Sequence, residues 1–239
     1  MWYAPVVPTD YEIYIRTGEL LALQKEPGSL THHDELQFQV VHQVAELWMK
    51  LIAHEVEHAA AELRGDRLGQ AIATFARIGR IQHLLLVQLD LLDTMPPMNY
   101  MTIRAGLGRG SGQESPGFRT MLRLPGEVMW PAFEEVLTRR GRTLRDIYER
   151  PDDHHELYTL AEAMIEYDQQ LQTWRYRHLM LVYRQIGTGT PSLKGKHSEL
   201  LAHGLKTRFF PKLWEVRDEL FADWTQSMLK QGADTGYHG

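Results

Sequence analysis

Long stretches of apolar residues at helical spacing dominate this chain and predict an all-α fold. These stretches cover residues 11–24, 31–65, 67–93, 153–186 and 200–229, the last read as a helical pair broken at Pro211. Met95, Pro96 and Pro97 end the third stretch because proline cannot continue a helix. No segment shows the alternation of paired strands, so we expect a helical bundle.

The stretch over residues 31–65 is long enough to form a central helix. Seven apolar side chains are predicted to make its buried face: Val40, Val41, Val44, Leu47, Trp48, Leu51 and Ile52. With 239 residues, 43% of them hydrophobic, the chain can bury a sizeable core. It shows no repeat or low-complexity linker, so we expect one domain over residues 1–239, with residues 231–239 as a flexible tail.

Composition excludes several classes of function. The chain has no cysteine, which rules out disulfides, thiolate-bound haem, iron–sulfur clusters and a cysteine nucleophile. Its net charge is −5 with both signs interspersed, so neither nucleic acid nor an anionic membrane is an expected partner. The start of the chain resembles no targeting signal, and Gln88 and Asp90 interrupt the most apolar run, residues 84–92. These features predict a soluble, cytoplasmic protein.

A zinc-hydrolase pattern occurs at residues 54–58, which read His-Glu-Val-Glu-His. Its extended form requires Gly and His where this chain has Ala61 and Arg64, and no glutamate lies between Arg64 and Glu114. Both histidines of the pair also point roughly 120° to 160° away from His42 on a helix. We therefore keep a zinc hydrolase as a remote alternative and interpret the histidine pair as an amphipathic or interface feature of the helix.

A glycine-rich segment, residues 104–118, separates the long helices. No strand precedes it and no Lys-Ser or Lys-Thr follows, which argues against a phosphate-binding loop. A loop that lets the backbone approach a bound ligand closely fits better.

Two pairs of residues four apart suggest a binding pocket. Phe38 and His42 share one helical face, and Tyr100 and Arg104 repeat the spacing just ahead of the glycines. Such an arginine can hold a carboxylate while the ring packs against the ligand. His178 lies within a long helical stretch, between arginines that could pair with acidic groups. From the residues alone, the alternatives of a core histidine and a surface arginine remain open.

Several ordered blocks of the sequence resemble the tryptophan 2,3-dioxygenase family, whose members bind b-type haem through one histidine and oxidise an aromatic amino acid with dioxygen. The blocks are residues 11–15, residues 33–50, residues 98–112 continued by Ser115, Phe118 and Arg119, residues 174–178 (Trp-Arg-Tyr-Arg-His) and residues 207–220. Agreement over most of the chain is more specific than any single motif. The resemblance implies a helical bundle that encloses haem b.

The resemblance also implies a role for each matched residue. His178 would be the axial ligand of the haem iron, and His42 would hydrogen-bond to the ring N–H of the substrate. The residues implied to bind substrate are Phe38, Tyr100, Arg104, Ser111, Thr188, Thr190, Tyr11, Tyr14 and Ile15. Arg104 would pair with the substrate carboxylate, and either Thr188 or Thr190 would contact the amine. The arm over residues 1–25 would reach a neighbouring subunit in a homotetramer.

The implied reaction is 2,3-dioxygenation of L-tryptophan or a close analogue to N-formylkynurenine, as in tryptophan catabolism. Two departures leave a second reaction open. Residues 186–192 are shorter than the matching family segment, and Gln113 and Glu114 replace the usual Phe-Gln. Some divergent relatives insert one oxygen atom, so a haem-dependent monooxygenase that forms a 2-oxindole or hydroxylates an aromatic amino acid is the alternative.

Overall fold

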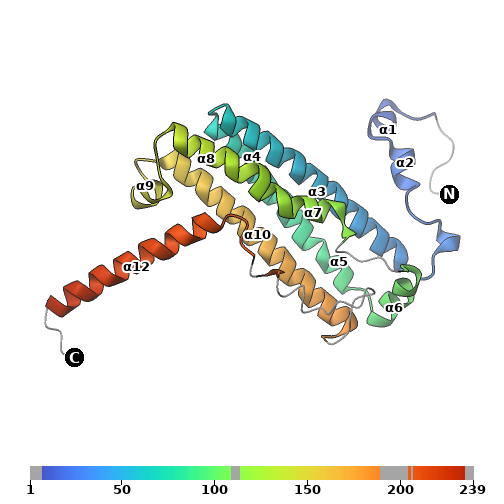
Figure 1. Ribbon diagram of the computed structural model, residues 1–239. Helices are drawn as coiled ribbons and strands as arrows, with labels where there is room; N and C mark the ends of the chain where they lie inside the picture. Colours follow the sequence, from blue (N-terminus) through green and yellow to red (C-terminus); the bar gives the residue numbers. More distant parts are fainter. Residues whose placement is uncertain (1–6, 109–113, 189–203, 206, 235–239) are drawn as a thin grey trace.

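The computed structural model describes residues 7–108, 114–188, 204–205 and 207–234 (Figure 1). The helices in these ranges are α1 (Asp10–Ile15), α2 (Thr17–Leu21), the 3-10 turn η1 (Pro27–Ser29), α3 (Glu35–Arg64), α4 (Leu68–Val87), α5 (Leu89–Asp93), α6 (Pro97–Gly106), α7 (Pro116–Leu124), the π-helical η3 (Pro125–Met129), α8 (Trp130–Arg139), α9 (Leu144–Glu149), α10 (His155–Ile186) and α12 (Pro211–Asp234). No strand occurs within them, which confirms the all-α prediction.

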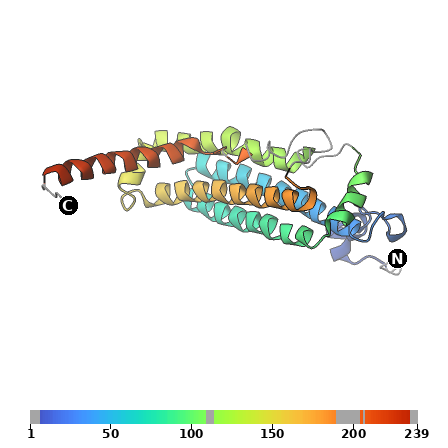
Figure 2. The same ribbon diagram turned by 90° about the horizontal axis from the view of Figure 1, so that it is seen from below.

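Three long helices, α3, α4 and α10, form the body of the molecule (Figure 1). Helix α4 packs along both α3 and α10, whereas α3 and α10 make few direct contacts with each other. Figure 2 shows α7 and α8 on one side of the bundle and α4 and α5 on the opposite side. The arrangement leaves α3 and α10 joined mainly through their neighbours.

The core runs through the middle of the bundle and is made of aliphatic and aromatic side chains. Side chains with less than 2% exposure come from α3, α4, α8, α10 and the segment before α12. They include Ile52, Leu63, Ile78, Phe133, Leu160, Met164 and Phe210. Each such side chain contributes roughly 1.5 to 3 kcal/mol through the hydrophobic effect.

The predicted buried face of α3 is partly wrong. Val41 and Ile52 are buried, and Val44, Trp48 and Leu51 are half-buried, but Val40 and Leu47 are 40% and 49% exposed. In this region, apolar residues lie on most sides of α3 itself. Periodicity alone therefore did not identify the side of the helix that packs on α4.

Helix boundaries depart from the predicted stretches at Gln88 and at Arg16, whereas the predicted break at Pro211 is confirmed. The stretch over residues 67–93 divides at Gln88 into α4 and α5. Arg16, with φ 55°, separates α1 from α2. Pro211 begins α12, because its missing N–H needs no partner in the first turn of a helix. In the first half of the predicted final pair, residues 200–203 and 206 lie outside the described residues.

A buried carboxylate fastens the segment before α12 to α10. Asp168 has no exposed surface, and its Oδ2 accepts hydrogen bonds from Trp214 Nε1 at 2.8 Å and from the Phe209 N–H at 3.1 Å. Beyond this anchor, α12 projects past the end of the bundle (Figures 1 and 2). The projecting part exposes an apolar stripe of four side chains, Phe221, Trp224, Met228 and Leu229.

The amino-terminal arm also exposes apolar side chains, including Tyr11, Ile13, Tyr14 and Leu23. Hydrogen bonds at its end connect it to α3, among them Gln24 Nε2 to Gln43 Oε1 at 2.6 Å and the Lys25 N–H to Gln39 Oε1 at 2.9 Å. None of the described helices is both long enough and apolar enough to cross a membrane.

Glu35 secures the start of α3. Its carboxylate accepts from the Thr31 N–H at 2.7 Å, from the Thr31 hydroxyl at 2.9 Å and from Lys25 Nζ at 2.5 Å, and the residue is only 4% exposed. The hydrogen bond from Lys25, followed by that from the Thr31 N–H, lowers the pKa of Glu35 below its ordinary value of 4.5. The resulting stabilisation is fully present above that pH and is lost as the pH falls through the lowered pKa.

We therefore expect Glu35→Gln to lower the free energy of unfolding at neutral pH by about 1 to 3 kcal/mol, since a hydrogen-bonded charge is lost. The difference between variant and parent should shrink below pH 4.5, because the parent carboxyl then becomes protonated. Urea unfolding at several pH values measures both. Glu57→Gln, at an exposed position of α3, is the control. A difference that did not change with pH would contradict this role.

Candidate functional site

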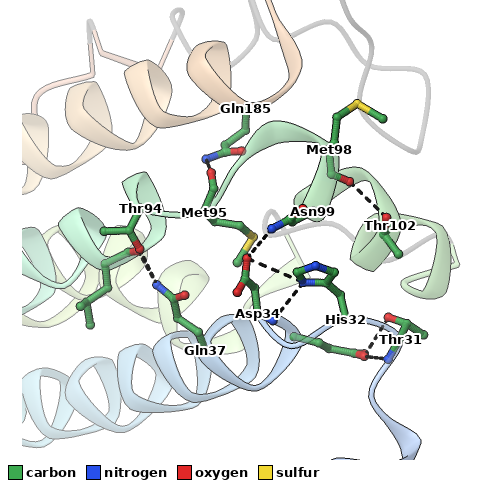
Figure 3. A network of polar contacts seen from close by, with 12 residues as sticks. Thr31, His32, Asp34, Gln37, Thr94, Met95, Met98, Asn99, Thr102 and Gln185 are labelled. Carbon is green, nitrogen blue, oxygen red and sulfur yellow. Dashed lines mark hydrogen bonds and ion pairs between the residues drawn. The ribbon is translucent and has the colours of Figure 1, made fainter.

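Polar contacts join the start of α3 to α6 at one end of the bundle (Figure 3). Asp34 Oδ2 accepts a hydrogen bond from Asn99 Nδ2 at 2.9 Å, and His32 Nδ1 accepts from the Asp34 N–H at 3.1 Å. Asp34, within the block of residues 33–50, therefore helps to shape this corner of the fold. Sequence reasoning did not identify Asn99, because its partner lies 65 residues away.

Two glutamines hold the turn between α5 and α6 (Figure 3). Gln37 on α3 donates through Nε2 to Thr94 Oγ1 at 3.1 Å. Gln185 on α10 donates through Nε2 to the Leu92 carbonyl at 3.2 Å and to the Met95 carbonyl at 3.0 Å. Hydrogen bonds from both α3 and α10 hold this turn, so the direction of α6, which follows it, is fixed. The side chains on α6 are thereby placed relative to both long helices.

Phe38, His42 and Tyr100 form an aromatic group across α3 and α6. The Phe38 ring centroid lies 4.1 Å from that of His42 and 6.1 Å from that of Tyr100. His42 Nδ1 lies 2.7 Å from the Phe38 carbonyl oxygen, which can only accept, so Nδ1 carries the proton of the neutral ring. His42 Nε2 is therefore left as a hydrogen-bond acceptor.

The ring of His42 favours the neutral state. Burial lowers its pKa, while the Phe38 carbonyl and the nearby charge of Glu46 act in the opposite direction. The side chain nevertheless keeps considerable exposed surface.

Arg104 lies close to the phenol of Tyr100. Burial raises the pKa of Tyr100, and the charge of Arg104 partly offsets this rise. Residues 100 and 104 are four apart on α6, so they share a face, as their spacing predicted. The half-buried guanidinium of Arg104 provides a cation beside the aromatic group.

His178 lies on α10, within electrostatic reach of His42. Burial, and secondarily the charge that His42 can carry, lowers the pKa of His178 to about 4. The imidazole is thus neutral at physiological pH, the form that binds metals. Its ring stacks on Trp174 with centroids 5.2 Å apart and planes 10° apart. Within the described residues, no hydrogen bond to either ring nitrogen occurs.

The two arginines beside His178 differ in their partners. Arg177 pairs with Asp90 at 2.9 Å and with Asp93, so it joins α10 to α5. Arg175 is half-buried, burial lowers its pKa against the influence of Asp168, and its Nη1 is buried without a hydrogen-bond partner in the described structure. A buried, unsatisfied cationic N–H suits an acidic group of a ligand.

Glu46 on α3 positions the start of α7. Its carboxylate accepts from the Gly117 N–H at 3.0 Å and from the Ser115 hydroxyl, and Ser115 Oγ accepts from the Phe118 N–H at 3.0 Å. A Cβ atom at position 117 would lie 2.7 Å from Glu46 Oε2 and 2.8 Å from Met49 Cβ. At this position the glycine allows close packing of α7 on α3.

The structure brings together five predicted site residues, Phe38, His42, Tyr100, Arg104 and His178. Thr188 is exposed just after α10, and Tyr11, Tyr14 and Ile15 are exposed on α1, which packs on α2. Ser111 and Thr190 lie outside the described residues. Glu46 and Trp174 also contribute to the site but had no predicted role. For Trp174, its spacing of four residues from His178 was the sequence feature that could have indicated one.

The zinc pattern on α3 does not form a metal site in the described part of the chain. His54 and His58 are exposed, and Glu55 pairs with Arg77 at 2.9 Å. No group of three or more histidine or acidic side chains suited to a metal ion occurs among the described residues.

Gly117→Ala should destabilise the protein by about 1 to 3 kcal/mol, because the added methyl group overpacks the contact with Met49. Gly69→Ala, at a helical position with no atom within 4 Å of an added Cβ, should be neutral or slightly stabilising. Thermal unfolding of both variants tests the difference. Equal stability of the two variants would contradict the close approach of α7 to α3.

Comparisons with known proteins show which family this chain belongs to. The family described as Tryptophan 2,3-dioxygenase matches residues 6–128. The protein named tryptophan 2,3-dioxygenase in Caulobacter vibrioides is 33% identical over 88% of this chain and 98% of its own length. The protein of that name in Myxococcus xanthus is 31% identical over 89% of this chain and 90% of its own length. The chain belongs to the tryptophan 2,3-dioxygenase family.

Proposed function

We propose that this protein is a haem-dependent oxygenase that adds both atoms of dioxygen across the C2–C3 bond of L-tryptophan, breaking it to give N-formylkynurenine. The observation that carries the proposal is the aromatic group of Phe38, His42 and Tyr100 across α3 and α6. His178 on α10 lies near enough for the charge of His42 to affect its pKa. Relatives named tryptophan 2,3-dioxygenase, which align over most of the chain, support the substrate and the reaction.

The described residues suit a haem group, and we propose haem b. His178 offers a neutral imidazole on a rigid helix, and Arg175 offers a buried N–H without a partner that suits a carboxylate. We therefore assign His178 to the iron and Arg175 to an acidic group of the cofactor. When bound, ferrous haem supplies the centre that activates dioxygen.

The remaining residues would bind and orient the substrate. His42 Nε2 accepts the indole N–H, since its Nδ1–H is already bonded to Phe38. Phe38 and Tyr100 pack against the ring, and the aromatic surface excludes water from it. Arg104 pairs with the carboxylate. By the family resemblance, Thr188 or Thr190 would contact the amine and Ser111 would lie near the haem; Ser111 and Thr190 are outside the described residues.

We place the protein in the cytoplasm as a homotetramer. The exposed apolar side chains of α1, α2 and α12 favour association with other subunits. Isolated helices of a few turns are marginal in water, yet α1, α2 and the end of α12 expose their apolar faces. We place the arm over residues 1–25, with Tyr11, Tyr14 and Ile15, against a neighbouring subunit of a single-domain chain. A monomeric mass by light scattering would contradict this assembly.

The reaction is tested with protein reconstituted with haem and incubated with tryptophan under ¹⁸O-labelled dioxygen. We expect a Soret band and a product that carries two labelled atoms. His178→Ala should lose stable haem binding, whereas His58→Ala, at an exposed position of α3, should retain it. One labelled atom would instead establish the monooxygenase alternative, and full haem content in His178→Ala would refute the ligand assignment.

Arg104→Leu tests the substrate's orientation. Removal of one partner of a desolvated charge pair should weaken tryptophan binding by about 2 to 5 kcal/mol. Tryptamine, which lacks the carboxylate, should bind parent and variant almost equally. Arg123→Leu, which removes an exposed arginine paired with Glu127 on the α7 side, is the control. Equal losses for both ligands would contradict the carboxylate contact.

A further inference from the structure

Trp174 on α10 is held by two neighbouring helices. Its Nε1–H donates to the Leu85 carbonyl on α4 at 3.0 Å. The Phe118 ring on α7 packs against it with centroids 5.3 Å apart and planes at 40°. The indole therefore joins three helices through one side chain, and that side chain also touches His178.

The acceptor of the Trp174 hydrogen bond favours a fixed indole. Leu85 lies in the last turn of α4, where carbonyl groups lack intrahelical partners and carry the negative end of the helix dipole. The space beside the indole is also small. The cavity that Trp174 lines with Leu85, Phe118 and Leu171 has a volume of about 10 Å³, at the lower limit for one water. Trp174 thus has both a directional bond and close packing to prevent its rotation.

The fixed indole restricts the His178 ring. The two rings are 5.2 Å apart between centroids and nearly parallel, at 10°. Rotation of the imidazole out of this plane would drive its edge toward the indole face, so the stack selects one orientation of the imidazole. Residues that orient a metal-binding histidine commonly affect the metal's affinity and electronic properties.

We propose that Trp174 is a positioning residue that fixes the plane of the His178 imidazole and thereby the orientation in which it binds the haem iron. The inference rests on the proposed function, since it requires His178 to be the axial ligand. Trp174 acts through His178 and has no assigned contact with the substrate.

Two substitutions separate the parts of this role. Trp174→Phe keeps a ring that can stack on His178 but removes the N–H that bonds to Leu85. Trp174→Leu removes both the ring and the bond. Trp214→Phe is the matched control, because Trp214 also donates a hydrogen bond from Nε1, at 2.8 Å to Asp168, but is not stacked on His178 in the described structure.

The first measurement is the iron–histidine stretching band of the ferrous protein by resonance Raman spectroscopy. We expect the band to shift and broaden in Trp174→Leu, to change less in Trp174→Phe, and to match the parent in Trp214→Phe. The second measurement is haem dissociation, by transfer to an apoprotein acceptor. Dissociation should be about 10-fold faster in Trp174→Leu than in the parent, the lower end of the effect of residues that support a ligand.

The outcomes distinguish this inference from the proposed function. A parent protein without an iron–histidine band would overturn both, because His178 would not be the ligand. A parent with the band and a Trp174→Leu variant with unchanged band and haem dissociation would overturn the role of Trp174 alone. If Trp174→Leu did not fold, the same comparison with Trp174→Phe would decide. A Trp214→Phe variant that changed as much as Trp174→Leu would indicate general destabilisation and would also overturn it.

Discussion

The packing of α4 against both α3 and α10 determines the rest of the structure. Ile52 on α3, Ile78 on α4 and Leu160 on α10 have no exposed surface, and such close-packed cores permit little movement of one helix against another. Because α4 joins two helices that scarcely touch, its side-chain volumes set how far apart they stand. The distance between the imidazoles of His42 and His178 therefore depends on the distance between α3 and α10, the helices that carry them.

Helical periodicity predicted the long helices well, since the core requires apolar residues at a period of about 3.6. It did not predict the division at Gln88 or the exposure of Val40 and Leu47. The hydrogen bonds of Gln37 and Gln185 with the turn after α5 were likewise not predicted, because no repeating pattern marks such polar contacts. Helices α7 to α9 are short, so their periodic signal was too weak to assign singly.

For the site, the four-residue spacing predicted only pairs of neighbours on one helix. Phe38 with His42, and Tyr100 with Arg104, could be predicted because neighbours on one helical face must meet. The approach of His42 to His178 spans most of the chain, and only the family resemblance connected them. The tautomer of His42 depends on a single backbone carbonyl, which requires coordinates.

Asp168 links this site to the carboxy-terminal part of the chain. Its buried carboxylate accepts from Phe209 and Trp214, and it lies on the same helix as His178. Detaching the terminal segment would leave a charge in the core without its donors, a change that costs several kcal/mol. The segment before α12 and the helix that carries His178 should consequently open together, as one cooperative unit whose amide hydrogens exchange with solvent at a shared rate.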